Sequence, residues 1–176
     1  MKTYKILTLF PLILLMISLS ACGFKPLYSS NETHEGNAPY SPLAEIEISN
    51  IPDEEGQILR NHLIDRFYAS GYPQNPKYRL DVARINAQTR DLDVTIRSDA
   101  TREQIRLTTQ LALFDIKAQK VILTRSLSAV GSYNVLESQY TTYVSRSDIR
   151  ENLIQDLALQ VERHVMLALE RQHQAQ

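Results

Sequence analysis

A run of strict alternation constrains the fold of this chain more than any other feature. From Gln104 to Leu111, every second side chain is polar and those between are mostly apolar. The alternate positions hold Ile105, Leu107, Thr109, Leu111 and Leu113. A period of two predicts a β-strand with one buried face and one solvent-exposed face. Such a strand requires a sheet whose apolar face is covered by a second layer.

Three further stretches predict strands of the same sheet. Residues 44–49 and 121–130 are short apolar-rich segments, the first alternating cleanly. Residues 78–96 also alternate, but their phase slips, which predicts a bulge or bend because a one-residue slip turns every side chain to the other face. The polar residues 97–101 predict a hairpin connection.

Two amphipathic segments predict helices. The first begins with Asp53 as its expected N-cap, runs to about Ser70, and ends at Gly71 and Pro73. The second begins after Ser147 as its expected cap and follows a tyrosine-rich connection over 131–143. Apolar residues recur at helical spacing in both segments. They are Ile58, Leu59, Leu63, Ile64 and Phe67 in the first, and Ile149, Leu153, Leu157, Val161, Val165 and Ala168 in the second.

The predicted order is therefore β, α, β, β, β, α. Two amphipathic helices need a surface to cover, and one apolar face of a sheet provides it. We expect residues 43–176 to form a single α+β domain, a two-layer sandwich with both helices on one face of a mostly antiparallel four-stranded sheet. The other face of that sheet is polar.

The N-terminus predicts a lipoprotein signal. Lys2 and Lys5 precede an apolar run of about 14 residues, shorter than the roughly 20 that a membrane-spanning helix needs. The run closes on Leu19-Ser20-Ala21-Cys22, with small residues before the cysteine. Cys22 is the only cysteine, so no internal disulfide is available to it. We expect cleavage before Cys22 and acylation of that residue, with an ordinary secretory signal or an apolar cytosolic helix as the alternatives.

This interpretation divides the chain into a signal peptide over 1–21, a lipidated arm over 22–42 and the α+β domain. The arm is rich in proline, asparagine and glycine, a composition typical of linkers. The formal net charge of the whole chain is −1, without the basic excess that general nucleic-acid binding usually requires. We therefore expect no nucleic-acid partner.

No catalytic or metal-binding constellation emerges from the sequence. The four histidines, His34, His62, His164 and His173, are scattered and have no second cysteine to join them. There is no nucleophile elbow of the Gly-x-Ser-x-Gly type and no phosphate-binding glycine loop. We expect a protein that is not an enzyme and that carries no cofactor beyond its covalent lipid.

Two sets of residues remain as candidates for binding. Five arginines gather around the predicted hairpin: Arg84, Arg90, Arg97, Arg102 and Arg106. Their guanidinium groups suit the phosphates or carboxylates of an anionic amphiphile. The alternative is a solvated hairpin in which they neutralise nearby acids, namely Asp91, Asp93, Asp99 and Glu103. Tyr133, Tyr140 and Tyr143 are candidates either for the core or for an interface.

Three features together resemble a known family. They are Cys22-Gly23-Phe24-Lys25-Pro26-Leu27-Tyr28 after the signal, Ser132-Tyr133-Asn134 followed by Tyr140-Thr141-Thr142, and a long terminal helix beginning near Asp148. The chain resembles the lipopolysaccharide-assembly lipoprotein LptE family, particularly its alphaproteobacterial form. The family fold, two helices over a four-stranded sheet, matches the predicted order.

This resemblance implies a role without catalysis. Such a protein sits at the outer membrane as a plug inside the LptD β-barrel, helps that barrel assemble, and assists the insertion of lipopolysaccharide into the outer leaflet. It implies lipopolysaccharide contact at the hairpin, where Arg97 matches the family position, with Arg102 and Arg106 beside it. The rival hypothesis is an auxiliary lipoprotein of an ABC-type envelope lipid transporter.

Overall fold

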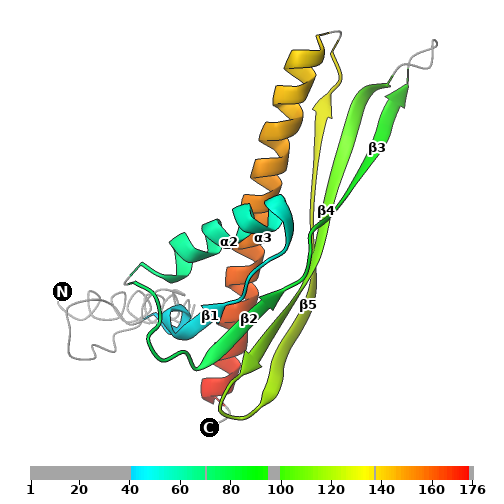
Figure 1. Cartoon of the computed structure of the whole chain (residues 1–176). Coiled ribbons are helices and arrows are strands. Elements are labelled where there is room, and N and C mark those ends of the chain that lie inside the picture. Colours follow the sequence, from blue (N-terminus) through cyan, green and yellow to red (C-terminus); the bar gives the residue numbers. More distant parts are fainter. Residues whose placement is uncertain (1–40, 70, 95–99, 137, 175–176) are drawn as a thin grey trace, which may run out of the picture. The chain divides into compact units, whose positions relative to one another are not determined.

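A computed structural model describes residues 41–69, 71–94, 100–136 and 138–174. The elements follow one another from a short 3-10 helix to a long C-terminal α-helix (Figure 1). They are η2 (Pro42–Glu45), β1 (Ile46–Ile48), α2 (Asp53–Phe67), β2 (Tyr78–Val82), β3 (Asn86–Val94), β4 (Ala100–Asp115), β5 (Lys120–Asn134) and α3 (Gln139–Gln174). Cys22 and its signal lie outside the described residues.

β4 is the central strand of a mixed sheet. β5 lies antiparallel along one side of it, while β2 and β3 follow one another antiparallel along the other side. β1 joins the outer edge of β2 in parallel. The prediction of an α+β sandwich with a mostly antiparallel sheet is confirmed, with five strands in place of four.

The additional strand arises where the sequence alternation slips. Val82 is opposite Leu111 and Asn86 is opposite Thr108, so one more residue lies between the two pairs on the β2–β3 side than on β4. Ala83 stays tied to β4 at this point: its N–H donates to the Gln110 carbonyl, and its own carbonyl accepts from the Thr109 hydroxyl at 2.7 Å. The expected single bent strand is thus two strands separated by a short break.

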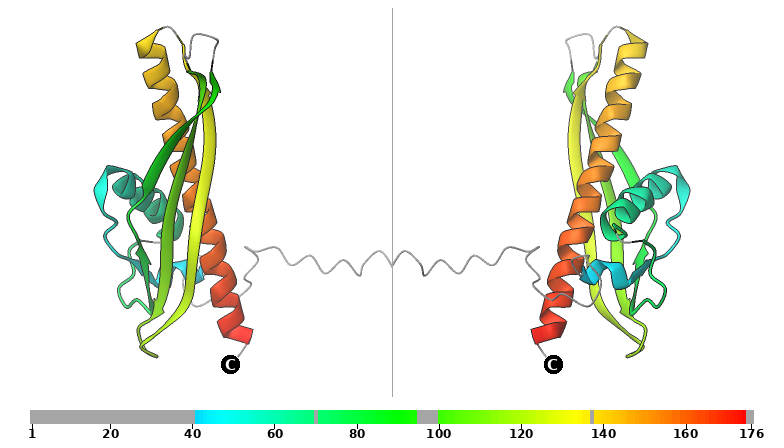
Figure 2. Two further views of the ribbon diagram at one scale, coloured as in Figure 1. Left: turned by 90° about the vertical axis from the view of Figure 1, so that its right-hand side faces the viewer. Right: turned by 90° about the vertical axis from the view of Figure 1, so that its left-hand side faces the viewer.

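Both helices lie on the apolar face of the sheet, as the two side views in Figure 2 show. The alternating residues of β4 are buried beneath α3, and the predicted stripe of α3 is buried against them from Leu153 to Ala168. The core of α2 is formed by Leu59, Leu63 and Phe67. An ion pair of 2.8 Å between Arg66 and Glu162 links the two helices.

The ends of the helices differ from the sequence expectation. α2 ends at Phe67, three residues early, and Gly71 beyond it has φ of +104°, which favours glycine. Asp53 does not cap α2 with its side chain, because both carboxylate oxygens bind Arg84 instead. The Arg84 guanidinium lowers the pKa of Asp53 by this hydrogen bonding. Asp53 also has φ of +68°, an uncommon backbone conformation for a residue other than glycine.

One edge of the sheet is closed by a tyrosine. The Tyr68 hydroxyl donates to the Ile46 carbonyl at 2.9 Å and accepts from the Ile48 N–H at 3.0 Å. Both backbone groups belong to β1, the edge strand next to β2. A single side chain therefore takes the place of a neighbouring strand here. Burial raises the pKa of this hydroxyl.

Candidate functional site: the hairpin end of the domain

The two candidate regions of the sequence meet at one end of the domain. β3 and β4 are joined there, and β5 passes into α3 at the same end (Figure 1). Arg102 of β4 is the register partner of Asn134 in β5, although the two residues are far apart in sequence. We call this region the hairpin end. Arg97, the position that the resemblance to the LptE family singles out, lies outside the described residues.

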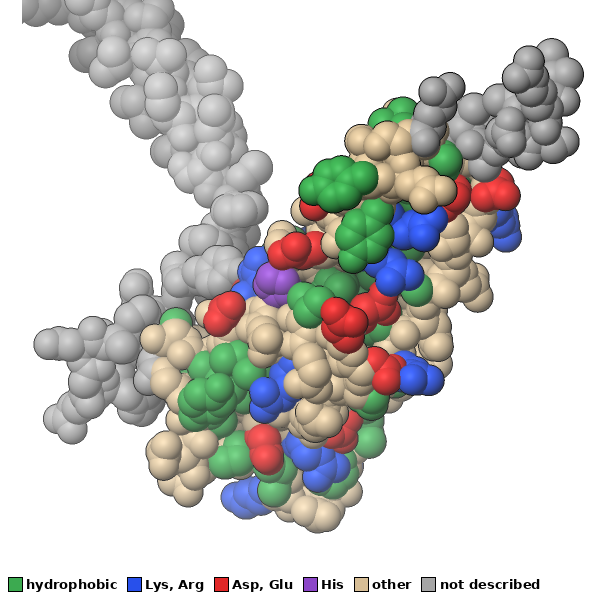
Figure 3. All heavy atoms as spheres, turned by 45° about the horizontal axis from the view of Figure 1, so that its top comes forward, with side chains coloured by type: hydrophobic (Ala, Val, Ile, Leu, Met, Phe, Trp, Pro, Cys, Tyr) green, Lys and Arg blue, Asp and Glu red, His purple; other side chains and the backbone are tan. Residues whose placement is uncertain are grey.

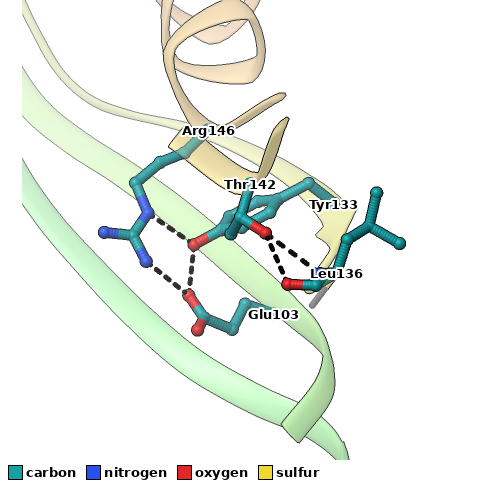
Figure 4. A network of polar contacts seen from close by, with 5 residues as sticks. All are labelled: Glu103, Tyr133, Leu136, Thr142 and Arg146. Atoms are coloured by element: carbon teal, nitrogen blue, oxygen red, sulfur yellow. Dashed lines mark hydrogen bonds and ion pairs between the residues drawn. The ribbon is translucent and has the colours of Figure 1, made fainter. Parts of the chain in front are cut away.

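A polar network secures the start of α3 to the sheet at the hairpin end (Figure 4). The Tyr133 hydroxyl donates to a carboxylate oxygen of Glu103, and the Arg146 Nε–H donates to the Tyr133 hydroxyl at 2.6 Å. Arg146 also pairs directly with Glu103 at 3.2 Å, and its guanidinium lies over the Tyr133 ring, 5.5 Å from the centroid. Strand β4, strand β5 and helix α3 each contribute one residue.

The electrostatics of this network hold it in one protonation state. Burial, followed by the hydrogen bond to Glu103, raises the pKa of Tyr133 above its ordinary value. The pKa of Arg146 is also raised, chiefly because the Tyr133 hydroxyl accepts its hydrogen bond. The tyrosine therefore remains neutral and the guanidinium charged well above neutral pH. Tyr133 is only 5% exposed, which makes it a core residue and not part of a free surface.

The other two candidate tyrosines are exposed. The helix begins at Gln139, nine residues before the expected start after Ser147, so Tyr140 and Tyr143 lie on its first turns. The capping residue is Ser138, whose hydroxyl oxygen accepts from the Thr141 N–H at 3.4 Å. Tyr140 is 78% and Tyr143 is 70% exposed.

Further apolar side chains surround these tyrosines. Leu136 and Val144 are also exposed, and with the two tyrosines they form a group that we call the aromatic tip. In the space-filling view, apolar side chains gather at this end beside basic and acidic ones (Figure 3). A hollow of about 240 Å³ opens there. It is lined by Val135, Leu136, Gln139, Thr142, Tyr143 and Arg146.

Hydrogen bonds hold the backbone beneath the aromatic tip in place. The Thr142 hydroxyl accepts from the Leu136 N–H at 3.0 Å and donates to the Leu136 carbonyl at 3.2 Å (Figure 4). Exposed apolar residues that are held in place in this way suit contact with a partner, because little ordering is lost when they bind.

The arginines near the hairpin have different surroundings. Arg84 is paired with Asp53, away from the hairpin end. Arg102 donates to the Ser132 hydroxyl at 3.0 Å, and Arg106 donates to the Ser128 hydroxyl at 3.3 Å. Both lie on the sheet face that the helices leave open. Within the described residues, no ion pair involves Arg90, Arg102 or Arg106.

One of the two alternatives from the sequence placed Glu103 among the acids that neutralise these arginines, and neither alternative gave Arg146 a role. In the structure Glu103 lies on the helix-facing side of β4 and binds Arg146. No local pattern signals this pair, because its members are 43 residues apart. The register of β4 with β5 brings Glu103 opposite Tyr133, and the early start of α3 brings Arg146 to both.

In the ranges that the structure describes, no group of histidines, cysteines or carboxylates could hold a metal ion. The helices in those ranges also include none with the length and apolar character to cross a bilayer.

Comparisons with known proteins place the fold. No protein-family model matches the chain. The uncharacterized protein RP188 of Rickettsia prowazekii (strain Madrid E) is 27% identical over 136 residues, covering 77% of this chain and 80% of that protein. Among solved structures, a minor lipoprotein from Acinetobacter baumannii matches 70% of this chain and 92% of its own, with a TM-score of 0.57 and 23% identity.

A second solved structure is the rare lipoprotein B from Shewanella oneidensis. It matches 71% of this chain and 96% of its own, with a TM-score of 0.54 and 11% identity. At such identities the likeness establishes the fold, which this chain shares with these bacterial lipoproteins.

Proposed function

We propose that this protein is an outer-membrane lipoprotein of the LptE kind, which plugs the LptD β-barrel, assists its assembly and helps insert lipopolysaccharide into the outer leaflet. The protein acts by binding and not by catalysis. The fold shared with the minor lipoprotein and rare lipoprotein B supports this proposal. The lipoprotein signal that the sequence predicts to end at Cys22 is a second, independent support.

The observation that carries the proposal is the exposed aromatic tip. A small soluble domain gains nothing from holding Tyr140, Tyr143, Leu136 and Val144 in water, whereas an interface uses such residues as anchors. The Glu103–Tyr133–Arg146 network fixes the first turns of α3, so the tip is preorganised for docking.

The arginines on the open sheet face supply the second half of the proposed role. Arg102 and Arg106 form no ion pair with a described carboxylate, and both belong to β4, which follows the predicted hairpin residues 97–101 in sequence. Guanidinium groups bind phosphate strongly, and the lipid A part of lipopolysaccharide carries phosphates. In this proposal the aromatic tip contacts the barrel and the arginines contact the lipid.

One affinity purification tests the proposal. The acylated full-length protein is captured from membranes of its own organism, and the partners are identified by mass spectrometry. Recovery of an LptD-type β-barrel is the expected result. Recovery of an inner-membrane ATPase complex without a barrel would overturn the proposal in favour of the transporter hypothesis.

A further inference from the structure

Strand β3 has a neighbouring strand on one side of its backbone and none on the other. It pairs with β4 alone, and it lies on the side of β4 away from β5 and α3 (Figure 1). The side chains of residues 86–92 are all exposed, on both faces of the strand. Pairing with β4 therefore holds β3 in place and leaves its outer side open.

One hydrogen bond shows which way the backbone groups of β4 point. The Ala83 N–H donates to the Gln110 carbonyl, so the backbone groups of Gln110 face the β2–β3 side of β4. In an antiparallel pair this direction alternates from one residue to the next. The even-numbered residues of β4 between 104 and 110 therefore direct their backbone groups toward β3.

The same alternation applies to β3. Even-numbered residues of β3 are opposite even-numbered residues of β4, as in the pair of Gln88 with Arg106, so their N–H and C=O groups face β4. The odd-numbered residues point their backbone groups outward. These residues are Ala87, Thr89 and Asp91. We call their backbone groups the β3 edge. Within the described part of the chain, no backbone hydrogen bond reaches them.

The corresponding side of β5 is interrupted. Ser128 is opposite Thr108, whose backbone faces β3, so the Ser128 carbonyl points away from β4. The Gln160 side chain of α3 donates to this carbonyl at 3.1 Å. A strand added along β5 would have to displace that bond. The β3 edge is thus the more accessible of the two sides.

A hollow beside the start of β3 provides room for another chain. Its volume is about 590 Å³, and its walls include Ala87 of β3, Glu55 of α2 and Arg150 of α3. Glu55 and Arg150 form an ion pair of 3.2 Å. Ala87 is opposite the buried Leu107, which places it on the helix-facing side of the sheet. A bulky side chain opposite the small Ala87 would fill part of this hollow.

The side chains of β3 determine which charges a partner strand should carry. Arg90 is opposite Gln104 on the open face, and Asp91 is opposite Glu103 on the helix-facing side. Neither Arg90 nor Asp91 forms an ion pair with a described residue. Opposite charges that face each other across two strands stabilise the pairing, and like charges weaken it. A matching strand therefore has an acid opposite Arg90 and a base opposite Asp91.

A second copy of this chain in antiparallel pairing does not match these charges. The outward-facing residues of both copies are odd-numbered, and hydrogen-bonded residues lie directly opposite each other. An odd-numbered residue is then always opposite an odd-numbered one, so Arg90 is never opposite Asp91. Pairs of β3 strands centred on Arg90 or on Asp91 would place like charges opposite each other.

We propose that the β3 edge binds an extended segment of another protein, which joins the sheet as an antiparallel strand. The segment carries an acid opposite Arg90, a base opposite Asp91 and an apolar side chain opposite Ala87. The inference does not depend on the proposed function, because it uses none of the residues assigned to the barrel or to the lipid. The binding is measurable without any barrel protein.

The probe is a blocked hexapeptide, acetyl-Lys-Glu-Val-Thr-Ile-Thr-amide, whose residues are opposite positions 91 to 86 in that order. Its binding to the acylated full-length protein in detergent is followed by hydrogen exchange measured by NMR. The amide protons of Ala87, Thr89 and Asp91 are expected to gain protection, because each would donate to the peptide. Those of Gln88 and Arg90 already donate to β4 and should change little. Absence of binding, or protection without this alternation, overturns the proposal.

A peptide with its two charges exchanged is the matched control. Acetyl-Glu-Lys-Val-Thr-Ile-Thr-amide has the same composition but places a base opposite Arg90 and an acid opposite Asp91. It should bind at least about tenfold more weakly, since two attractive pairs become two repulsive ones. A variant with both Arg90→Glu and Asp91→Arg should reverse this preference. Equal binding of the two peptides by the wild type, or an unreversed preference in the variant, would overturn the proposal.

Two further measurements complete the test. The melting temperature of the double variant should stay close to the wild-type value, because both positions are exposed. Sedimentation of the wild type in detergent should show a monomer, whereas a dimer that the hexapeptide dissociates would assign the β3 edge to a second copy and overturn the proposal.

The proposed function and this inference can fail separately. Peptide binding that persists when no barrel is recovered from membranes would leave the β3 edge standing while the proposed partner fails. Barrel recovery without peptide binding gives the opposite result.

Discussion

Gly131 of β5 and Leu153 of α3 lie so close together that a Cβ atom on the glycine would stand 3.3 Å from a methyl carbon of the leucine. The same atom would be 3.0 Å from Ile149. The missing side chain allows α3 to lie directly on the last part of β5. The aromatic tip begins just beyond this contact, so its position depends on the close approach of the two elements.

Gly131→Val should therefore destabilise the domain. Overpacking a filled contact typically costs about 1–3 kcal/mol, and the added methyl groups have no space between Ile149 and Leu153. Urea unfolding followed by circular dichroism measures the change. The control is Ser126→Val on the open face of the same strand, which should alter the free energy of unfolding by less than about 0.5 kcal/mol. Equal stability of the two variants would contradict the contact.

Removal of both tyrosines of the aromatic tip should reduce binding of the barrel partner and leave the folding of the domain unchanged. Tyr140→Ala combined with Tyr143→Ala takes away two exposed rings, and buried aromatic anchors at interfaces are commonly worth about 2 kcal/mol or more each. We expect barrel recovery to fall at least about tenfold with little change in melting temperature.

Tyr72→Ala is the matched control for this experiment. Tyr72 is also an exposed tyrosine, but it follows α2 and packs its ring against Tyr68, 4.9 Å between centroids. Its loss should leave barrel recovery unchanged. A barrel yield that is the same for the tip variant and the Tyr72 variant would remove the aromatic tip from the interface.

Arg146→Met tests the network beneath the tip. The substitution deprives Glu103 of its cation and Tyr133 of a donor, and the loss of such partners typically costs about 1–3 kcal/mol. Chemical unfolding should show this loss. Arg163→Met, on an exposed position of the same helix, should be nearly neutral. If Arg146→Met were as stable as Arg163→Met, the network would not contribute to holding α3.

Alkaline pH should destabilise the domain through one buried and two partly buried tyrosines. Burial raises the pKa of Tyr68, Tyr78 and Tyr133 above the ordinary value of 10.0. The folded state then keeps protons that the unfolded state releases, so stability is full below pH 10 and falls as the pH rises through the folded-state pKa values.

Unfolding in urea at a series of pH values from 8 to above 10 measures this effect. Tyr133→Phe should show a shallower fall with pH than the wild type, because one of the three groups no longer titrates. Tyr143→Phe, at an exposed position, is the control and should follow the wild-type slope. A Tyr133→Phe slope equal to that of the wild type would contradict the assignment.

Cys22→Ser tests the anchor. Serine has no thiol to receive diacylglycerol, so incorporation of labelled palmitate should be abolished and the protein should leave the membrane fraction. Ser20→Ala keeps a small residue before the cleavage site and should still incorporate palmitate. Membrane association of the Cys22→Ser variant equal to that of the wild type would show that another feature anchors the protein.

Much of the fold could be predicted because its signals are local. The alternation from Ile105 to Leu113 and the stripe from Leu153 to Ala168 depend only on neighbouring residues, and both are buried as expected. In the sequence, the break between β2 and β3 is visible only as a phase slip in the alternation. Whether such a slip ends a strand depends on the hydrogen-bonding groups that β4 presents opposite it.

The candidate site was less accessible from sequence. The tyrosine-rich segment through Tyr143 has no clear helical periodicity, so α3 was expected to begin after Ser147, although Ser138 provides the cap. Asp53 was expected to cap α2, but Arg84, 31 residues away, binds it instead. The grouping of Glu103, Tyr133 and Arg146 depends on strand register, which no short-range pattern records.

The Tyr68 hydroxyl on β1 has a consequence for association between chains. An unpaired edge strand invites another polypeptide to add a strand, and natural proteins block such edges. The Tyr68 hydroxyl already binds the Ile46 carbonyl and the Ile48 N–H of β1. These two backbone groups are therefore not available to another strand, and the sheet is not extended on that side. Among the described strands, β3 and β5 each pair with β4 alone. Any chain that lengthens this sheet must therefore join it at β3 or β5.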